Sequence, residues 1–373
     1  MYLKKIRVLH VAPGFLYGGI EMRLIDWYKN IDHNLVHFDV VKVTPDVPNP
    51  LVDALREMGV GVYSIPPLSL STAFEHIRQI KHIVTVGHYD VIHCHSLSYA
   101  FFPFIFSKKL GGQKRILHSR TTQMNGKGIV KIIDILLSNM AKNEATDYFA
   151  CSKEAGKFAF GPNCSFHVVN NGIILSDFNF NLDARKQLRE RFKLEGYLVL
   201  GFVGRFTEAK NIPFLFEVFG KIHKEDAHTK LLLVGDEKQG TIYNEVIEIA
   251  NRYESLNDII FVGRQNNVSE WMSAMDVFLM PSLYEGFGTV AVEAQATGLP
   301  CFVSDKIPRT IDVGGNISFL PINNTDVDEW AREILKLKGK KRDSGNHDLI
   351  SQAGFDAKKI GKWLEEYYLS DQN

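Results

Sequence analysis

The chain has 373 residues, of which 45% are hydrophobic and 23% are charged, so it suits a globular protein with two domains of ordinary size. Its 43 basic and 43 acidic residues leave no net charge, which gives no reason to expect bulk attraction to nucleic acid. The four cysteines show no Cys-x-x-Cys spacing and fit reduced core thiols better than a disulfide framework.

Short β-branched runs alternate with helical patterns along the chain, which is typical of βαβ units and parallel sheets. A first series of strands is expected at residues 6–11, 38–43, 60–64, 91–93, 115–118, 148–151 and 167–169. After a charged, helix-prone segment, a second series is expected at residues 198–203, 231–234, 259–262, 277–280, 301–304 and 318–320. The pattern predicts an α/β fold of two doubly wound domains that face each other across a cleft, with ligands beyond the carboxyl ends of the strands.

Two adjacent glycines, Gly18 and Gly19, follow the first strand and open a helix. They allow the backbone to approach a charged group closely at the positive end of that helix, although a plain strand–helix turn explains them too. The spacing is not Gly-x-Gly-x-x-Gly, which disfavours a nicotinamide cofactor.

Three histidines end strands of the first series. His118 is expected at the mouth of the cleft, with a core histidine as the alternative. His93 and His95 share one face of an extended strand, a spacing that suits a metal. No carboxylate or third histidine is obviously supplied, so a structural or acceptor-side role is favoured for this pair.

A second candidate for a metal, the acidic string from Asp326 to Asp328, follows Asn323 and precedes a helical pattern. It predicts a helix cap with acids in the first turn. We therefore expect no metal site in this chain.

Two cations follow the first strand of the second series, Arg205 directly and Lys210 five residues later. Fixed cations at the carboxyl end of a strand can neutralise a diphosphate leaving group as charge accumulates on it. The alternative is two solvated surface cations.

Two carboxylates, Glu285 and Glu293, are eight positions apart, and the first is followed by Gly286, Phe287, Gly288 and Thr289. Glycines at a helix start expose backbone N–H groups that bind phosphate. If a helix begins near Gly288, the carboxylates lie about 10 Å apart, the span of a sugar, a diphosphate and a ribose. The alternative is a helix with an acidic N-terminal residue and one solvated glutamate.

With its flanks, residues 271–282 and 294–300, this segment resembles the donor site of the family 4 (group 1) retaining glycosyltransferases, whose signature is Glu, seven residues, Glu. The resemblance covers nearly the whole chain, from Gly18-Gly19 through Asn171-Gly172 and Val203-Gly204-Arg205 to the last helix. It implies the GT-B fold. Residues 1–178, completed by the helix 355–373, would form an acceptor-binding domain, and residues 179–354 a donor-binding domain.

The resemblance also implies an activity, the retaining transfer of a hexose or N-acetylhexosamine from a nucleoside-diphosphate sugar, with UDP favoured. It puts Arg205 and Lys210 on the diphosphate, His118 near the transferred sugar, and Gly18 and Gly19 near the donor phosphates. No carboxylate pair at nucleophile and acid spacing emerges. The mechanism that the resemblance implies is front-face displacement, and no metal or other cofactor is expected. The rival interpretations are a nucleotide-sugar epimerase or hydrolase and a non-catalytic nucleotide-sugar-binding subunit.

Two apolar segments of the first half, residues 99–106 and 124–142, lie beside or among lysines and arginines. This composition suits shallow attachment to an anionic bilayer, and ordinary helices packed on the sheet are an equal alternative. The apolar run from Val8 to Val11 is too short for a signal peptide, and residues 99–106 are too short for a bilayer span, so a cytoplasmic protein is expected. The segments resemble those of bacterial capsule and exopolysaccharide enzymes, which implies a peripheral enzyme and a polyprenyl-diphosphate-linked glycan acceptor.

Overall fold

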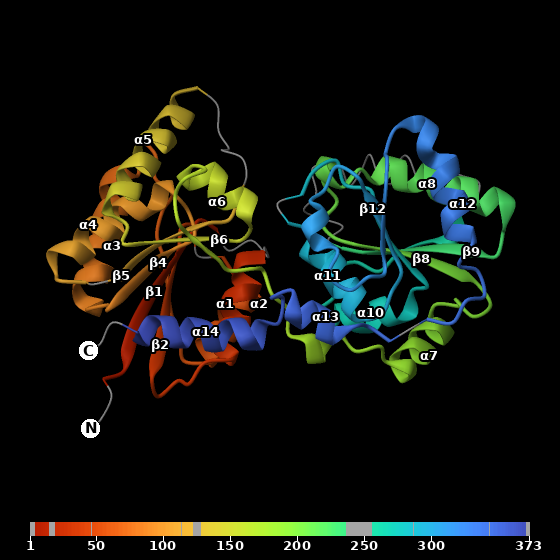
Figure 1. Ribbon diagram of the computed structural model, residues 1–373, viewed down its shortest axis with the longest axis horizontal. Helices are drawn as coiled ribbons and strands as arrows, with labels where there is room; N and C mark the ends of the chain where they lie inside the picture. The colour runs from red at the N-terminus through yellow and green to blue at the C-terminus, as the bar shows by residue number, and fades with distance from the viewer. Residues whose placement is uncertain are drawn as a thin grey trace. The chain divides into compact units, whose positions relative to one another are not determined.

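The computed structural model describes residues 4–14, 19–45, 47–112, 114–121, 128–235, 256–285, 287–342 and 344–370. The chain divides into two compact units, residues 1–172 with 354–373 and residues 173–353. The last helix therefore belongs to the first unit. The sequence predicted a domain boundary after residue 178, a few residues later than the boundary in the structure, which follows residue 172. Each unit consists of helices around a parallel sheet (Figure 1).

The first unit is built on a parallel sheet with the strand order β3-β2-β1-β4-β5-β6-β7. Its strands are β1 (Ile6–Ala12), β2 (Val36–Lys42), β3 (Gly61–Ser64), β4 (Val91–Cys94), β5 (Lys114–Ser119), β6 (Asp147–Ala150) and β7 (His167–Val168). One face is covered by α1 (Gly19–Lys29), α2 (Pro50–Glu57) and α14 (Ala357–Leu369). The other face is covered by α3 (Ala73–Gly87), α4 (Phe101–Lys109) and α5 (Gly128–Glu144), and α6 (Lys153–Phe160) follows β6 (Figure 1).

The second unit is built on a parallel sheet with the strand order β10-β9-β8-β11-β12-β13. Its strands are β8 (Leu198–Val203), β9 (Thr229–Val234), β10 (Ile259–Phe261), β11 (Val277–Met280), β12 (Cys301–Ser304) and β13 (Ile317–Leu320). Its α-helices are α7 (Leu182–Arg191), α8 (Ile212–Glu225), α10 (Val268–Ala274), α11 (Thr289–Ala296), α12 (Val327–Leu335) and α13 (His347–Gln352). The strand order changes direction between β8 and β11, the position where doubly wound sheets bind their ligands.

All thirteen expected strands are present, and this confirms the α/β prediction. Parallel strands covered by helices on both faces read as continuous apolar runs, and every residue of β8 is buried. The acidic string lies at a helix start as predicted. The Asp326 carboxylate accepts a hydrogen bond from Asn323 N at 2.6 Å in a capping box, and Asp328 forms an ion pair with Lys221 at 2.7 Å.

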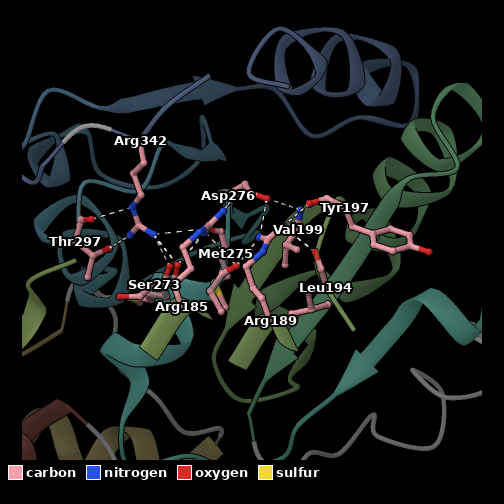
Figure 2. Close-up of polar contacts among 12 residues, drawn as sticks. Arg185, Arg189, Leu194, Tyr197, Val199, Ser273, Met275, Asp276, Thr297 and Arg342 are labelled. Carbon is pink, nitrogen blue, oxygen red and sulfur yellow. Dashed lines mark hydrogen bonds and ion pairs between the residues drawn. The ribbon is translucent and has the colours of Figure 1, made fainter. Parts of the chain in front are cut away.

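Three arginines fasten α7 and the segment after α12 to the second sheet (Figure 2). Arg185 Nη2 and Arg189 Nη1 bind the two oxygens of Asp276 at 2.5 and 3.1 Å, and Asp276 Oδ2 also accepts from Val199 N at 2.8 Å. Arg342 lies in a segment without regular structure. The three guanidinium groups also donate to backbone carbonyls of Met272, Ser273, Ala274, Met275, Leu194, Tyr197 and Thr297. Several of these carbonyls end α10, where helices leave acceptors unpaired.

The two apolar segments of the first unit differ in exposure. Helix α4 packs into the core, where Phe104 is fully buried, so the packed interpretation holds for residues 99–106. Helix α5 instead exposes large apolar side chains, among them Ile129 at 70%, Ile132 at 65% and Leu136 at 58%. No helix among the described residues is long and apolar enough to cross a membrane.

Candidate functional site

The candidate site of the second unit lies at the carboxyl ends of β8 and β11, which are neighbours in the sheet. The loop after β8 carries Arg205 and a short 3₁₀ turn, Glu208–Lys210. The loop after β11 runs to α11 and carries Glu285. A backbone hydrogen bond of 2.8 Å from Leu283 N to Ala209 O joins the two loops. Loops that are 74 positions apart in sequence are thereby held together.

Lys210 and Glu285 form an ion pair across these loops. The two side chains are only 17% and 12% exposed, and Ser282 Oγ donates to the same carboxylate oxygen, Glu285 Oε1, at 2.7 Å. A partly buried pair held by a third group keeps fixed orientations and is less screened by salt than a surface pair. The sequence predicted both charged residues, and the structure brings them into direct contact.

The backbone around the pair requires glycine. Gly204 follows β8 with φ +157°, and a Cβ there would lie 3.5 Å from Lys210 Cε. Gly288 is the N-cap of α11 with φ +91°, and a Cβ there would lie 3.3 Å from Met280 Cε. At Gly204 a Cβ would be in ordinary contact with Lys210 and would lie closer to Phe202 Cζ, at 3.2 Å. A side chain at either position would therefore combine an unfavourable φ with one tight contact to a neighbouring core side chain, Phe202 or Met280.

Helix α11 begins at Thr289, as the sequence predicted, and carries no acidic residue in its first turn. Its N-terminus therefore offers N–H groups and the positive end of the helix dipole without an internal counter-charge. Phe287, just before the helix, is buried and Thr289 is half-buried. Glu293 is half-buried more than a turn further along α11, and Gly286 lies outside the described residues.

Arg205 is exposed and, within the described part of the chain, has no hydrogen bond or ion pair. The exposed guanidinium of Arg205 in the same loop as Lys210, the Lys210–Glu285 pair and a helix N-terminus together suit a polyanion with hydroxyl groups. The cations and the N–H groups match phosphate oxygens, and the carboxylates match hydroxyls.

The candidate residues of the first unit are placed differently. Gly19 is the first residue of α1, and Gly18 lies outside the described residues. His118, near the carboxyl end of β5, is fully buried rather than exposed. Its Nδ1 bonds His93 Nε2 at 2.9 Å, and its Nε2 has no partner within the described part of the chain. Burial, followed by the charge of Arg120, holds the pKa of His118 well below its usual range.

A third histidine, His10, joins His93 and His95, contrary to the sequence-based expectation that none was supplied. Their ligand atoms lie within 4.8 Å of one another. However, both nitrogens of His95 are already bonded, one to His10 Nδ1 at 3.0 Å and one to the Arg120 guanidinium at 3.2 and 3.3 Å. A cation would have to break these bonds beside a fixed positive charge. The residues therefore fit a hydrogen-bonded core better than a metal site.

Several contributors gave no signal in the sequence. Ser282 bonds Glu285 only three residues away, but a serine in a loop is not distinctive, and the Leu283–Ala209 bond joins two loops that are far apart in sequence. His10 is opposite His93 in the β1–β4 register, which depends on the strand order. The carboxylate spacing and the paired cations were visible in the sequence because each lies within a short segment of the chain, Glu285 to Glu293 and Arg205 to Lys210.

Comparison with known proteins supplies a family and a fold. The family described as "Glycosyl transferases group 1" matches residues 197–339. The chain is 30% identical over 380 residues to EpsF of Bacillus subtilis (strain 168), named as a glycosyltransferase, with 98% of this chain and 97% of EpsF covered.

An Escherichia coli protein named UDP-Gal:alpha-D-GlcNAc-diphosphoundecaprenol alpha-1,3-galactosyltransferase is 23% identical, with 90% of this chain and 89% of that protein covered. The crystal structure of Anabaena HepE in complex with UDP and glucose superposes with a TM-score of 0.77 at 19% identity. It covers 98% of this chain and 100% of HepE. This likeness shows the fold of two Rossmann-like domains that is called GT-B.

Proposed function

The chain belongs to the group 1 glycosyltransferases, and on that premise we propose that it moves a hexose or N-acetylhexosamine from a UDP-sugar to a glycan acceptor with retention of configuration. The observation that carries the donor site is the Lys210–Glu285 pair beside the start of α11. The UDP-bound state of HepE and the UDP-sugar named for the E. coli relative favour uridine.

Each candidate site residue of the second unit has a role in this proposal. Arg205, Lys210 and the N-terminus of α11, with Phe287, Gly288 and Thr289 shaping it, hold the diphosphate. Glu293 accepts the ribose hydroxyls, and Glu285 accepts hydroxyls of the transferred sugar. Gly18 and Gly19 of the first unit approach the donor phosphates, and His118 donates to the sugar.

The proposed reaction is a front-face displacement. The bond from the anomeric carbon to the diphosphate breaks, the acceptor hydroxyl bonds that carbon on the same face, and the leaving phosphate oxygen takes the hydroxyl proton. The chain contributes positioning and neutralises the charge that develops on the diphosphate. No side chain serves as a covalent nucleophile in this scheme.

Glu293→Ala and Arg205→Ala should each weaken UDP binding by about 10- to 150-fold, because each loses a charged hydrogen-bond partner worth about 1.5–3 kcal/mol. Isothermal titration calorimetry with UDP, GDP and ADP measures this. Glu217→Ala, an exposed glutamate on α8, is the matched control and should bind like the wild type. Unchanged binding of all three nucleotides in both site variants would rule out this donor site. Product analysis with and without acceptor then separates transfer from hydrolysis, epimerisation and binding alone.

Transfer should proceed without divalent metal, since Arg205 and Lys210 supply the positive charge that a metal would otherwise provide. Initial rates with EDTA and with added Mg²⁺ or Mn²⁺ should agree within about twofold, which is about 0.4 kcal/mol in activation free energy. Activity that chelator abolishes and metal restores would contradict this.

The proposed acceptor is a polyprenyl-diphosphate-linked saccharide at the inner face of the cytoplasmic membrane, received by the first unit. Two observations support it. The E. coli relative is named for a diphosphoundecaprenol acceptor, and α5 exposes an apolar surface of Ile129, Val130, Ile132, Ile133 and Leu136. Such a helix suits shallow insertion in a bilayer whose anionic lipids attract its neighbouring lysines. The role is that of a peripheral enzyme of cell-surface polysaccharide synthesis.

Ile129→Glu and Ile132→Glu should each reduce sedimentation with anionic vesicles by about tenfold or more, because burying one isoleucine contributes about 1.5–3 kcal/mol. Leu182→Glu is the matched control, since Leu182 is 68% exposed on α7 of the other unit, and it should bind vesicles normally. High salt should weaken binding of all variants. A wild-type protein that ignores anionic and neutral vesicles and glycosylates only soluble acceptors would contradict the lipid-linked proposal.

A further inference from the structure

Four histidines of the first unit lie on one face of three neighbouring strands. His10 of β1 is opposite His93 of β4, and His95 comes two residues after His93. Ile116 of β5 is also opposite His93, so His118, two residues further along, lies on the same face. Exposure of the four histidines is between 0% and 2%. Helices α1 and α14 cover this face with Trp27 and Tyr368.

Burial keeps these rings uncharged. It lowers the pKa of His10 to about 3 and holds the pKa of His93, His95 and His118 well below the usual range. A neutral imidazole has one N–H donor and one acceptor nitrogen. A hydrogen bond that fixes one ring nitrogen as the acceptor therefore places the hydrogen on the other ring nitrogen, and the reverse also holds.

The first chain of hydrogen bonds starts at Arg120, which can only donate. Its guanidinium donates to His95 Nδ1 at 3.2 and 3.3 Å, so the hydrogen of His95 is on Nε2. That N–H donates to His10 Nδ1 at 3.0 Å, which leaves the hydrogen of His10 on Nε2. The direction of this chain is fixed at its origin by a cation.

The second chain joins three residues through His93. Its Nδ1 lies 2.7 Å from Tyr368 Oη, and its Nε2 lies 2.9 Å from His118 Nδ1. If Tyr368 donates, the only unpaired group is the N–H at His118 Nε2. If the chain runs the other way, the Tyr368 hydroxyl hydrogen has no acceptor within the described part of the chain, and His118 Nε2 is an unpaired acceptor as well. The first direction leaves fewer buried polar groups unpaired, so it is favoured.

We propose that Tyr368 and His93 are positioning residues that hold the hydrogen of His118 on Nε2, where it donates to an oxygen of the sugar donor. This inference rests on the proposed function. His118 Nε2 has no acceptor among the described residues although it is buried, and it lies near the carboxyl edge of the sheet, where ligands bind.

A second unpaired donor lies beside it. The ring of Trp27 is stacked 6.3 Å from that of His118, and its Nε1 also has no partner within the described part of the chain. His10 Nε2, which carries the hydrogen of that ring, is a third buried donor without a partner among the described residues, so unpaired N–H groups gather on this face of the sheet.

The tautomer can be tested without substrate. Two-bond ¹H–¹⁵N correlation spectra of ¹⁵N-histidine-labelled full-length protein distinguish the two tautomers, and His118→Gln assigns the resonances. In the wild type, His118 should carry its hydrogen on Nε2. Tyr368→Phe removes the hydroxyl that sets the direction, so both directions leave equally many groups unpaired and His118 should become a mixture. Tyr367→Phe is the control. Tyr367 lies in the same helix as Tyr368, and its hydroxyl bonds Asp147 instead, so this variant should give the wild-type spectrum.

Kinetics give a second readout. We expect kcat of Tyr368→Phe to fall two- to tenfold with KM for the sugar nucleotide within twofold, and Tyr367→Phe to match the wild type. His93→Leu should lose tenfold or more in kcat. His93→Gln should recover most of that loss, because its amide oxygen can accept from Tyr368 while its NH₂ group donates to His118.

Two results would overturn the proposal, a wild-type His118 with its hydrogen on Nδ1, or a Tyr368→Phe protein that keeps the Nε2 tautomer and the kcat of Tyr367→Phe. A wild-type protein that transfers no sugar would refute the proposed function instead, while the spectra would still decide the tautomer.

Discussion

Lys210→Met should lower kcat for sugar transfer by a factor of about 10²–10³. A fixed donor that faces a developing anion contributes about 2.7–4 kcal/mol of transition-state stabilisation, and the leaving diphosphate gains charge as the glycosidic bond breaks. Lys210 is 17% exposed and is held by Glu285, so it is already positioned before the donor binds. Methionine keeps most of the packing volume and removes only the charge.

The matched control for this prediction is Lys221→Met. Lys221 lies near the end of α8, the helix that follows the Lys210 loop, and pairs with Asp328 on α12, but it is 39% exposed. Its replacement should leave kcat within about twofold of the wild type, because exposed ion pairs contribute little. Initial rates at saturating donor and acceptor measure both variants. A Lys210→Met enzyme with kcat within threefold of the wild type would show that Lys210 does not stabilise the leaving group.

Glu285→Gln tests whether the pair acts as a unit. Glu285 both orients Lys210 and, in the proposal, binds the sugar, so the single variants should each lose turnover. The double variant should lose much less than the product of the two single losses, because contacting residues are not additive.

The fold was predictable because its strands are covered on both faces. Such strands are continuous apolar runs, and β8 and β11 stand out even in one sequence. The start of α11 was predictable for a local reason, since Gly288 leads into an apolar helical pattern and its φ of +91° suits glycine.

What could not be predicted depends on register and on side-chain direction. His10 gave no sequence signal, because only the β1–β4 pairing brings it to His93. Tyr368 lies in the expected last helix, but nothing in the sequence shows that its hydroxyl contacts His93, which is 275 positions away. Arg342 lies in a segment without regular structure, and no spacing in the sequence shows that its guanidinium bonds carbonyls at the ends of α10 and α11. Long side chains link distant segments without leaving a periodic pattern.

Asp276→Ala should lower the free energy of unfolding of the second unit by about 3 kcal/mol. Asp276 follows α10 and is the carboxylate that Arg185 and Arg189 share, and it also accepts from Val199 N at the start of β8 (Figure 2). Removing one partner of such a cluster leaves charges and a backbone donor without their acceptor, which costs about 3–5 kcal/mol when the cluster is buried. The Asp276 side chain is 25% exposed, so the lower end of that range applies.

Asp328→Ala provides the contrast, since it removes a carboxylate of the same unit that is 72% exposed and pairs with a single lysine. Its effect should stay within about 0.5 kcal/mol. Urea denaturation of the full chain measures both variants, and amide hydrogen exchange should locate the stability lost in Asp276→Ala in β8 and α10.

The loss of stability should also affect the donor site. Because β8 leads directly to Arg205, the backbone amides of the loop that carries Arg205 should exchange faster in Asp276→Ala. UDP should then restore part of the lost stability by mass action, since it binds only the folded unit. Equal stability of the two variants would mean that the arginines find sufficient acceptors in the backbone carbonyls alone.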